Sequence, residues 1–256
     1  MLQLESIHFS YPNQTPVFEN FFWQVQRGES WAVLGPSGCG KTTLLYLVAG
    51  LLFPRAGNVR INGETLTRPR PHTGLIIQEY GLLPWATVRE NAQLGLKLRK
   101  FYGADGIHAP LDFEPNLDVD PWLDRLGILA QADQYPGQIS GGERQRAAIA
   151  RTLALEPDLL LMDEPFSSLD APTREGLQNL TLEIQAEQNL TSVVVTHTIE
   201  EAAMLGEKIL VLGQPPNTEP KVIPNPQSGS PGYRGSDAYY KMCHRLRQLM
   251  EEKKAT

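Results

Sequence analysis

The segment Gly35–Thr43 constrains the fold more than any other part of this chain. It reads GPSGCGKTT, follows the apolar run Ser30–Leu34 and precedes leucines at helical spacing up to Gly50. The sequence therefore predicts a buried strand, a glycine-rich loop and a helix in direct succession. Glycines allow backbone N–H groups to converge on one point, and the N-terminal end of a helix attracts negative charge. We expect a phosphate group to bind here, in a fold of the α/β class.

The spacing of Gly35, Gly40, Lys41 and Thr42 matches GxxxxGK[ST], the P-loop pattern. Lys41 would place its charge against the β- and γ-phosphates of a nucleotide, and the Thr42 hydroxyl can reach a Mg²⁺ ion. A glycine-rich turn without a ligand is the alternative, but the strand before the loop and the helix after it favour the P-loop. The residues expected to bind the nucleotide are Gly35, Pro36, Ser37, Gly38, Cys39, Gly40, Lys41, Thr42 and Thr43.

Apolar patterns divide the chain into one large α/β domain, residues 1–213, and a tail, residues 214–256. Met1–Val25 indicates a β-rich edge, and residues 87–155 indicate an inserted α-helical lobe with an acidic, Pro-rich surface loop at 103–120. The other expected elements are strands at Asn58–Ile61, Thr73–Gln78, Leu159–Met162, Ser192–Thr196 and Lys208–Leu212, and a helix at Pro172–Asn189. The tail is expected to form a Pro/Gly-rich loop and an amphipathic helix docked on the core. The expected fold class is α/β, a P-loop NTPase core with a mainly parallel sheet, an N-terminal antiparallel β edge and the inserted lobe.

Composition argues against several classes of function. The net charge is −6 over 256 residues, so the chain has no electrostatic footprint for nucleic acid. The N-terminus has neither the basic start nor the apolar core of a signal peptide, and no apolar run approaches the roughly 20 residues that span a bilayer. Only two cysteines occur, Cys39 and Cys243, which favours a reducing compartment. We therefore expect a cytoplasmic protein.

Two acidic residues, Asp163 and Glu164, follow the apolar run Leu159–Met162. Open α/β sheets bind ligands at the carboxyl ends of their strands, so this position suits a metal ligand and a base. Asp163 would hold Mg²⁺ directly or through water, and Glu164 would polarise the attacking water. Acidic pairs at strand ends are often only solvated, and the P-loop is what favours the catalytic interpretation.

Residues 139–143 read ISGGE and are followed by Arg144-Gln145-Arg146. This run resembles the LSGGQ signature of ABC ATPases, with Ile139 and Glu143 as departures. The other family motifs follow in order: Tyr11 resembles the aromatic A-loop residue, Gln78 the Q-loop glutamine, Ser167-Ser168-Leu169-Asp170 the D-loop and His197 the switch histidine. The resemblance spans about Leu2 to Leu212 and implies an ABC ATPase that binds and hydrolyses MgATP.

The resemblance implies a role for each of these residues within one chain. Tyr11 would stack on adenine, and Gln78 would orient the attacking water or the Mg²⁺ shell. His197 would orient the γ-phosphate together with Glu164. Glu164, His197, Gln78 and Lys41 are therefore the expected catalytic residues.

The resemblance also implies a second copy of the chain. Ser140, Gly141 and Gly142 would contact the nucleotide held by the other subunit, and Asp170 also belongs to the expected nucleotide-binding residues. Two chains would then pack head to tail around two ATP molecules. Glu143, an acid in the first turn of a helix, is expected to face away from the phosphates.

The stretch Gln78–Asn91, QEYGLLPWATVREN, resembles a segment of the nitrate/sulfonate/taurine importer ATPases. In that family it forms the groove that receives a cytoplasmic helix of the permease, so Trp85 is either an anchor for that partner or a buried core residue. The resemblance implies an importer subunit, peripheral on the inner face of the cell membrane, with integral permease subunits as partners and a substrate-binding protein acting indirectly. The ATPase of a two-component exporter and a soluble ABC protein are the alternatives. The solute is left open among nitrate, sulfonate, taurine, bicarbonate and a thiamine precursor, since other subunits select it.

Overall fold

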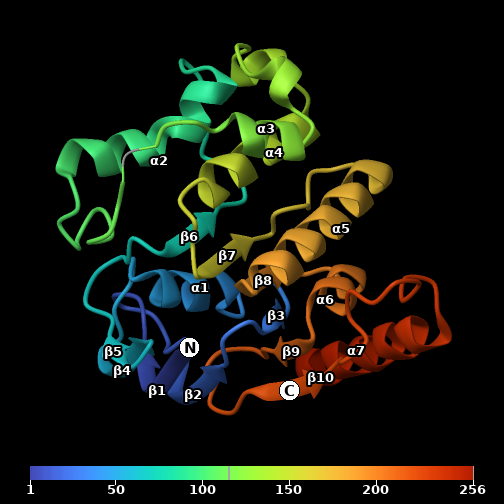
Figure 1. Cartoon of the computed structure of the whole chain (residues 1–256). Coiled ribbons are helices and arrows are strands. Elements are labelled where there is room, and N and C mark those ends of the chain that lie inside the picture. The colour runs from blue at the N-terminus through green and yellow to red at the C-terminus, as the bar shows by residue number, and fades with distance from the viewer. Residues whose placement is uncertain (115, 256) are drawn as a thin grey trace. The chain divides into compact units, whose positions relative to one another are not determined.

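The computed structural model describes residues 1–114 and 116–255, which form two compact units (Figure 1). The first unit combines Met1–Pro69 with Ile184–Thr256, and the second unit is Arg70–Glu183. The tail from residue 214 onward therefore belongs to the first unit and does not form a unit of its own.

An antiparallel sheet opens the first unit. Its strand order is β2 (Phe18–Val25), β1 (Leu2–Phe9), β4 (Ala56–Ile61) and β5 (Glu64–Thr65). The register of β1 shifts between Leu4 and Ile7, so the buried side chains change from even to odd positions along the strand. Asn62 and Gly63 join β4 to β5 with positive φ angles of 53° and 84°, as an Asn-Gly hairpin turn requires. This sheet is the β-rich edge that the sequence predicted.

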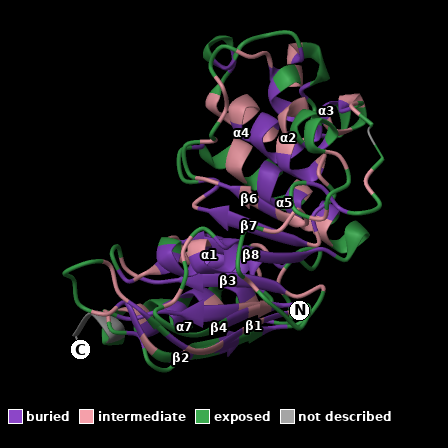
Figure 2. Cartoon of the chain, turned by 90° about the vertical axis from the view of Figure 1, so that its left-hand side faces the viewer, coloured by how far each residue is buried: buried purple, intermediate pink, exposed green. Residues whose placement is uncertain are grey.

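The remaining strands of the first unit follow the order β10 (Lys221–Pro224), β9 (Lys208–Val211), β3 (Ser30–Leu34) and β8 (Thr191–Thr196). β3 is parallel to both β8 and β9. Every residue of β3 and β8 is buried, as parallel strands covered on both faces require (Figure 2). The helices of this unit are α1 (Lys41–Ala49), α6 (Ile199–Leu205) and α7 (Asp237–Ala255).

One part of the tail differs from the prediction made from the sequence. Residues 214–235 were expected to form a loop, but β10 lies inside it and pairs antiparallel with β9. Only Ile223 of β10 is buried, and the strand ends at Pro224. A four-residue edge strand with a single buried side chain has no alternating pattern for a sequence to reveal.

The second unit carries two parallel strands and the helical lobe. β6 (Thr73–Ile76) pairs with β7 (Leu159–Asp163), so Ile76 lies opposite Met162. The lobe contains α2 (Val88–Tyr102), α3 (Asp120–Arg125) and α4 (Gly141–Leu153), with 3-10 turns at Leu129–Gln131 and Pro136–Gln138. Between α2 and α3 the described residues form no helix or strand, as their acidic, Pro-rich composition predicted. The last helix of the second unit, α5 (Ala171–Gln188), continues past Glu183, where that unit ends.

Candidate functional site

The glycine-rich loop lies in the first unit, between β3 and α1. Gly38 and Gly40 have φ angles of 77° and 102°, which side chains other than glycine rarely adopt. A Cβ atom on Gly40 would also approach Val17 Cγ1 to 2.5 Å. Ser37 and Gly38 are exposed. The loop therefore has a shape that glycine alone permits, and part of it is open to a ligand.

Lys41, the first residue of α1, is held by the loop itself. Its Nζ donates to Gly35 O over 2.9 Å and to Pro36 O over 3.0 Å, and the side chain is 7% exposed. Gly40 precedes the helix, and no side chain among the described residues caps it. The dipole at this end of α1 favours an anion. A fixed ammonium group and an uncapped helix start together form a cradle of the kind that suits a phosphate group.

Tyr11 lies beside this cradle. Its hydroxyl is 3.0 Å from Thr43 Oγ1 on the first turn of α1, and its ring packs edge-on against Phe9 at 5.0 Å between centroids. Tyr11 follows the end of β1 and is partly buried. The structure therefore brings the predicted aromatic residue and the P-loop together within one unit.

Asn217 is a residue of this region that the sequence analysis missed. It is buried, and its Nδ2 donates to Cys39 O over 2.9 Å while its Oδ1 accepts from Gly213 N over 3.0 Å. The tail thus supports the backbone of the glycine-rich loop. No local pattern could show this, because the two residues lie far apart in the sequence and an asparagine in a Pro-rich stretch usually indicates a turn.

His197 follows the buried strand β8 and is exposed. Burial changes abruptly here, since Thr196 is only 1% exposed. The strand therefore presents this imidazole at its carboxyl end, the edge where α/β sheets bind ligands.

In the second unit, Asp163 ends β7 and is 6% exposed, while Glu164 follows it and is partly exposed. Gln78 lies two residues beyond β6, the parallel partner of β7, and is exposed. All three side chains thus follow the carboxyl ends of paired strands. Glu164 has a φ angle of 46°, a left-handed conformation that costs about 1 kcal/mol or more for a residue other than glycine. Strain of this kind is concentrated at functional sites.

The signature run starts α4. Ser140 is the N-cap: its Oγ accepts from Glu143 N over 3.3 Å, and Glu143 Oε2 accepts from Ser140 N over 2.7 Å. These bonds from Ser140 lower the pKa of the Glu143 carboxyl. Ser140 is exposed, and Gly141 and Gly142 are partly exposed. The departure at Glu143 therefore completes a capping box and leaves the serine and the glycines open.

Tyr80 joins three motifs inside the second unit, which the sequence analysis also missed. Its hydroxyl is 2.6 Å from Ser168 Oγ in the D-loop. Arg144 of the signature helix lies over its ring, at 5.8 Å from the centroid. Arg151, later in the same helix, donates to Tyr80 O over 2.8 Å and to Gly81 O over 2.6 Å. The segment after Gln78 is thus bonded to both the signature helix and the D-loop.

The segment around Trp85 is a loop whose backbone is hydrogen-bonded to the Asn91 side chain. That fully buried side chain accepts from Leu83 N over 2.7 Å and donates to Ala86 O over 3.0 Å. Trp85 is 73% exposed. The structure therefore excludes the buried-core alternative for Trp85 and leaves a large apolar side chain exposed on a hydrogen-bonded loop.

Asp170, at the end of the D-loop, caps α5. Its Oδ2 accepts from Thr173 N over 3.3 Å, and the hydrogen bonds from Thr173 lower the pKa of this carboxyl. Asp170 is exposed. Earlier in the same loop, Ser167 Oγ donates to Glu164 O over 3.0 Å. The D-loop therefore fixes the backbone beside Glu164.

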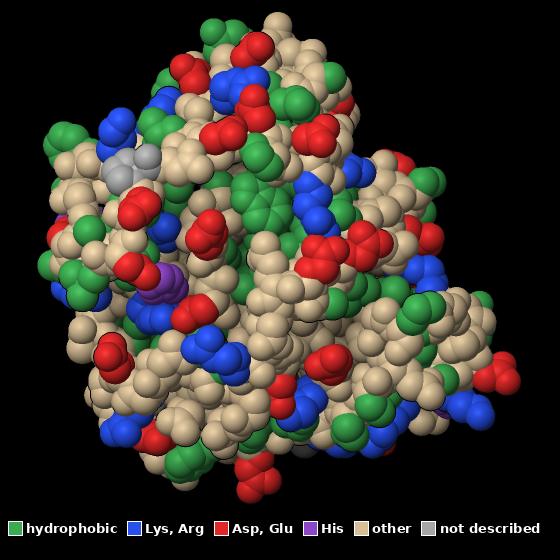
Figure 3. Space-filling view, viewed as in Figure 1, with side chains coloured by type: hydrophobic (Ala, Val, Ile, Leu, Met, Phe, Trp, Pro, Cys, Tyr) green, Lys and Arg blue, Asp and Glu red, His purple; other side chains and the backbone are tan. Residues whose placement is uncertain are grey.

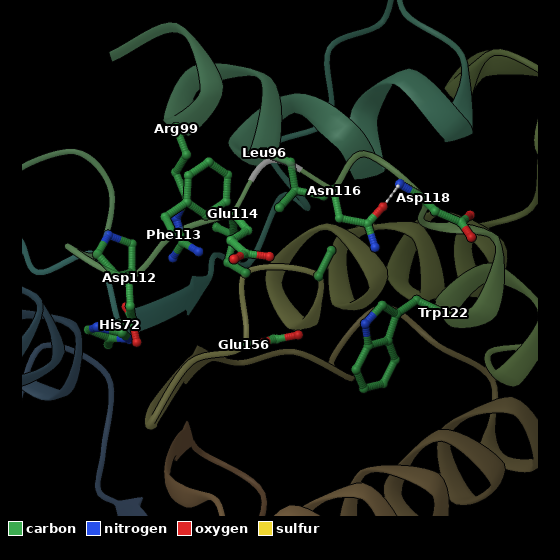
Figure 4. A pocket seen from close by; sticks show the side chains of 13 residues that line it. His72, Leu96, Arg99, Asp112, Phe113, Glu114, Asn116, Asp118, Trp122 and Glu156 are labelled. Carbon is green, nitrogen blue, oxygen red and sulfur yellow. Dashed lines mark hydrogen bonds between the residues drawn. The ribbon is translucent and has the colours of Figure 1, made fainter. Parts of the chain in front are cut away.

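A pocket of about 410 Å³ lies elsewhere in the second unit (Figure 4). None of the site residues predicted from the sequence lines it. Arg99 enters from α2, donates to Pro71 O over 2.5 Å and lies 5.7 Å from the centroid of the Phe113 ring. The pocket is thus the space under the loop between α2 and α3, which this arginine anchors.

On the face shown in Figure 3, lysine and arginine side chains are interspersed with aspartate and glutamate side chains. No helix within residues 1–114 and 116–255 has both the length and the apolar character needed to cross a bilayer.

Comparisons with known proteins agree with these motifs. The sequence model of the ABC transporter family matches residues 18–167, more than half of the chain. The aliphatic sulfonates import ATP-binding protein SsuB of Bacillus anthracis is 39% identical over 92% of this chain and 88% of its own length. The taurine import ATP-binding protein TauB of Ruegeria pomeroyi is 40% identical over 82% of this chain and 76% of its own length. The dimeric structure of a post-hydrolysis state of the ATP-binding cassette MJ0796, bound to ADP and Pi, has a TM-score of 0.71 and 28% identity, covering 88% of this chain and 98% of that chain.

Proposed function

The chain belongs to the ABC transporter family, and from that premise we propose that it is the ATP-hydrolysing subunit of an importer for a small solute. Two copies would bind two MgATP molecules head to tail and energise uptake through a separate permease. The single observation that carries the transport part is the loop that presents Trp85, 73% exposed and stapled by a buried asparagine.

In each chain, the first unit would provide the contacts to adenine and to the phosphates. Tyr11 would stack on adenine, the backbone N–H groups of residues 37–43 would receive the phosphates, and Lys41 would hold the β- and γ-phosphates. The support for this assignment is that Lys41 already points at its own loop, where its two carbonyl partners are replaceable by stronger, charged oxygen acceptors.

The donor chemistry fits Mg²⁺. Thr42 is exposed on the first turn of α1 and offers a hydroxyl, and Asp163 offers a carboxylate at the end of β7. The described residues contain no group of three or more His, Cys, Asp or Glu side chains that could cage a metal. Mg²⁺ keeps waters and takes substrate phosphates as ligands, so it needs few donors from the protein. When bound, it would neutralise charge on the phosphates, with Gln78 near its water shell.

Glu164 would accept the proton of the attacking water, and His197 would orient the γ-phosphate. Glu164 is suited to this role because the backbone conformation and the Ser167 bond to its carbonyl fix its position. Ser140, Gly141, Gly142 and Asp170 would serve the nucleotide of the partner subunit. Their exposure supports this, since each is exposed or partly exposed.

The names of two relatives favour one class of solute. SsuB is named for the import of aliphatic sulfonates and TauB for taurine, which is itself a sulfonate. We therefore favour a sulfonate-type anion, with nitrate and the other small solutes as alternatives. In this assembly the chain would sit on the inner face of the cell membrane, against the permease, and the substrate-binding protein would act on the outer side.

The test is Trp85→Ala, with Phe101→Ala as the matched control. Phe101 is 82% exposed in the same unit but lies at the far end of α2 from this loop. Removing an interface anchor should weaken association with the permease by about 2 kcal/mol, roughly thirtyfold. We expect Trp85→Ala to keep the melting temperature and the ATPase rate of the isolated subunit and to lose permease-stimulated hydrolysis in proteoliposomes. Retained stimulation, or an equal loss in Phe101→Ala, would contradict the proposal.

A further inference from the structure

The tail that follows β9 encloses the C-terminal end of α6. Asn225, 2% exposed, donates from Nδ2 to Ala203 O over 2.7 Å and to Gly206 O over 2.8 Å. Its backbone N–H donates to Glu207 O over 2.7 Å. The last carbonyl groups of a helix have no partner within the helix, so this asparagine takes the place of solvent. One side chain of the tail thus fixes the end of α6.

Two more side chains of the tail complete this arrangement. Tyr233, 4% exposed, donates its hydroxyl to Asn225 Oδ1 over 2.7 Å. Because this oxygen can only accept, the bond defines the orientation of the amide and directs Nδ2 toward α6. Ser228 Oγ donates to Met204 O over 2.7 Å. The tail therefore holds α6 through a connected set of hydrogen bonds.

The buried bonds matter more than the ion pair at the other end of α6. There, Arg247 of α7 lies 3.4 Å from Glu200 Oε1, with both side chains more than half exposed. An exposed pair of this kind contributes about 0 to 1 kcal/mol. Loss of a bond that leaves a buried acceptor unpaired costs more, about 1 to 3 kcal/mol. Asn225 and Tyr233 are therefore the residues through which the tail acts on α6.

α6 is bonded in turn to the strand end that carries His197. Glu201, 4% exposed on the first turn of α6, accepts a hydrogen bond from the Thr196 hydroxyl. The same hydroxyl oxygen accepts from Thr198 N over 3.0 Å. The Glu201 carboxylate of α6 is thus bonded to Thr196, and the Thr196 hydroxyl in turn bonds the backbone of Thr198 on the other side of His197. A displacement of α6 would carry the backbone at His197 with it.

We infer that the tail positions His197 for ATP hydrolysis. Asn225 and Tyr233 are positioning residues that act through α6, and Glu201 with Thr196 forms the link to the histidine. This inference rests on the role proposed above for His197. It gives a function in the reaction to a segment that lies outside residues 18–167, which the family's sequence model matches.

The first test is Tyr233→Phe, which removes one hydroxyl and keeps the ring. Tyr240→Phe on α7 is the control, since Tyr240 is 62% exposed. We expect kcat to fall about fivefold in Tyr233→Phe, with the KM for ATP unchanged, because the phosphates are held by the P-loop. Ser228→Ala is a milder second variant, with kcat about twofold lower. A rise in KM with kcat unchanged would overturn the inference.

The second test places Tyr233→Phe in a His197→Ala background and measures single-turnover hydrolysis. If the tail acts through His197, Tyr233→Phe should cause no further loss there, since coupled residues are not additive. If Tyr233→Phe lowered the rate equally in both backgrounds, the tail would not act through His197. The inference about the tail would then be overturned, and the role proposed for His197 would stand. If His197→Ala itself hydrolysed ATP at the wild-type rate, the proposed role of His197 would fall, and the inference with it.

Discussion

The glycine-rich loop of the first unit and the signature run of the second unit both precede a helix, yet they are built differently. Within the first, Lys41 donates to two carbonyls of its own loop, and Asn217 supports the backbone at Cys39. At the second, Ser140 is exposed and the adjacent glycines are partly exposed. The glycine-rich loop is thus held by contacts within its own unit, whereas the signature run presents open groups to solvent. In the proposed dimer each chain would contribute half of two sites, and a second copy would close both.

The largest expected effect comes from separating the two halves. Lys41→Ala and Ser140→Arg should each reduce hydrolysis by about a hundredfold or more when present in every chain, since each breaks both sites. A mixture of the two variants should recover activity. In a mixed dimer, one site carries both changes and the other carries neither.

The measurement is the ATPase rate of each variant alone and of the mixture, with dimer formation checked by differently tagged chains. Lys97→Ala, on the exposed face of α2, is the control for removal of a lysine charge. An inactive mixture that demonstrably contains mixed dimers would show that the two runs do not complete each other across the interface.

The helix that begins at the signature run, α4, also contains a buried amide. Gln145 of α4 is 0% exposed, and its amide oxygen and nitrogen have no hydrogen-bond partner among the described residues. An unpaired buried amide costs about 1 to 3 kcal/mol. We expect Gln145→Met, which is similar in size and unbranched, to raise the free energy of unfolding by about 1 kcal/mol and the melting temperature by about 3 °C.

The control for Gln145→Met is Gln93→Met on α2. The Gln93 amide donates to Leu117 O over 2.8 Å, so the same substitution there removes a bond that is made and should lower the melting temperature. If both variants melted at or below the wild-type temperature, the Gln145 amide would not be a source of instability. If Gln145→Met were more stable than wild type but hydrolysed ATP more slowly, the buried amide would serve the reaction at the expense of stability.

The parts of the site that the sequence predicted are those encoded by neighbouring residues. The loop shape at Gly38 and Gly40 depends on glycine itself, and the apolar run before Asp163 predicts a buried strand wherever it occurs. Asn217, Asn225 and Tyr80 could not be predicted in the same way. Each acts on a backbone or side chain that the fold brings close from elsewhere, and each has an ordinary local context.

The helical lobe shows the same limit. A tryptophan after a proline is compatible with either a core or a surface position, so the sequence left Trp85 open. Trp85 is exposed in a loop whose backbone bonds the buried amide of Asn91, later in the chain. β10 and α6 were not predicted from the sequence for a related reason. Elements of four and seven residues carry too few apolar positions to show a period.

The smallest expected effect tests the departure at Glu143, and it depends on pH. The Ser140 bonds lower the pKa of this carboxyl in the folded state. Its contribution to stability is therefore full above the unfolded pKa, about 4.3, and is lost as the pH falls through the lower folded value. Glu143→Gln keeps an acceptor for Ser140 N but has no charge to lose. We expect wild type to melt slightly higher than Glu143→Gln at pH 7, and the difference to shrink below about pH 4. Glu183→Gln, on the exposed surface of α5, is the control for the loss of a glutamate charge. A difference that stayed constant from about pH 7 to about pH 3 would show that the charge of Glu143 does not stabilise the start of the signature helix, and would leave its acceptor oxygen as the whole of its contribution.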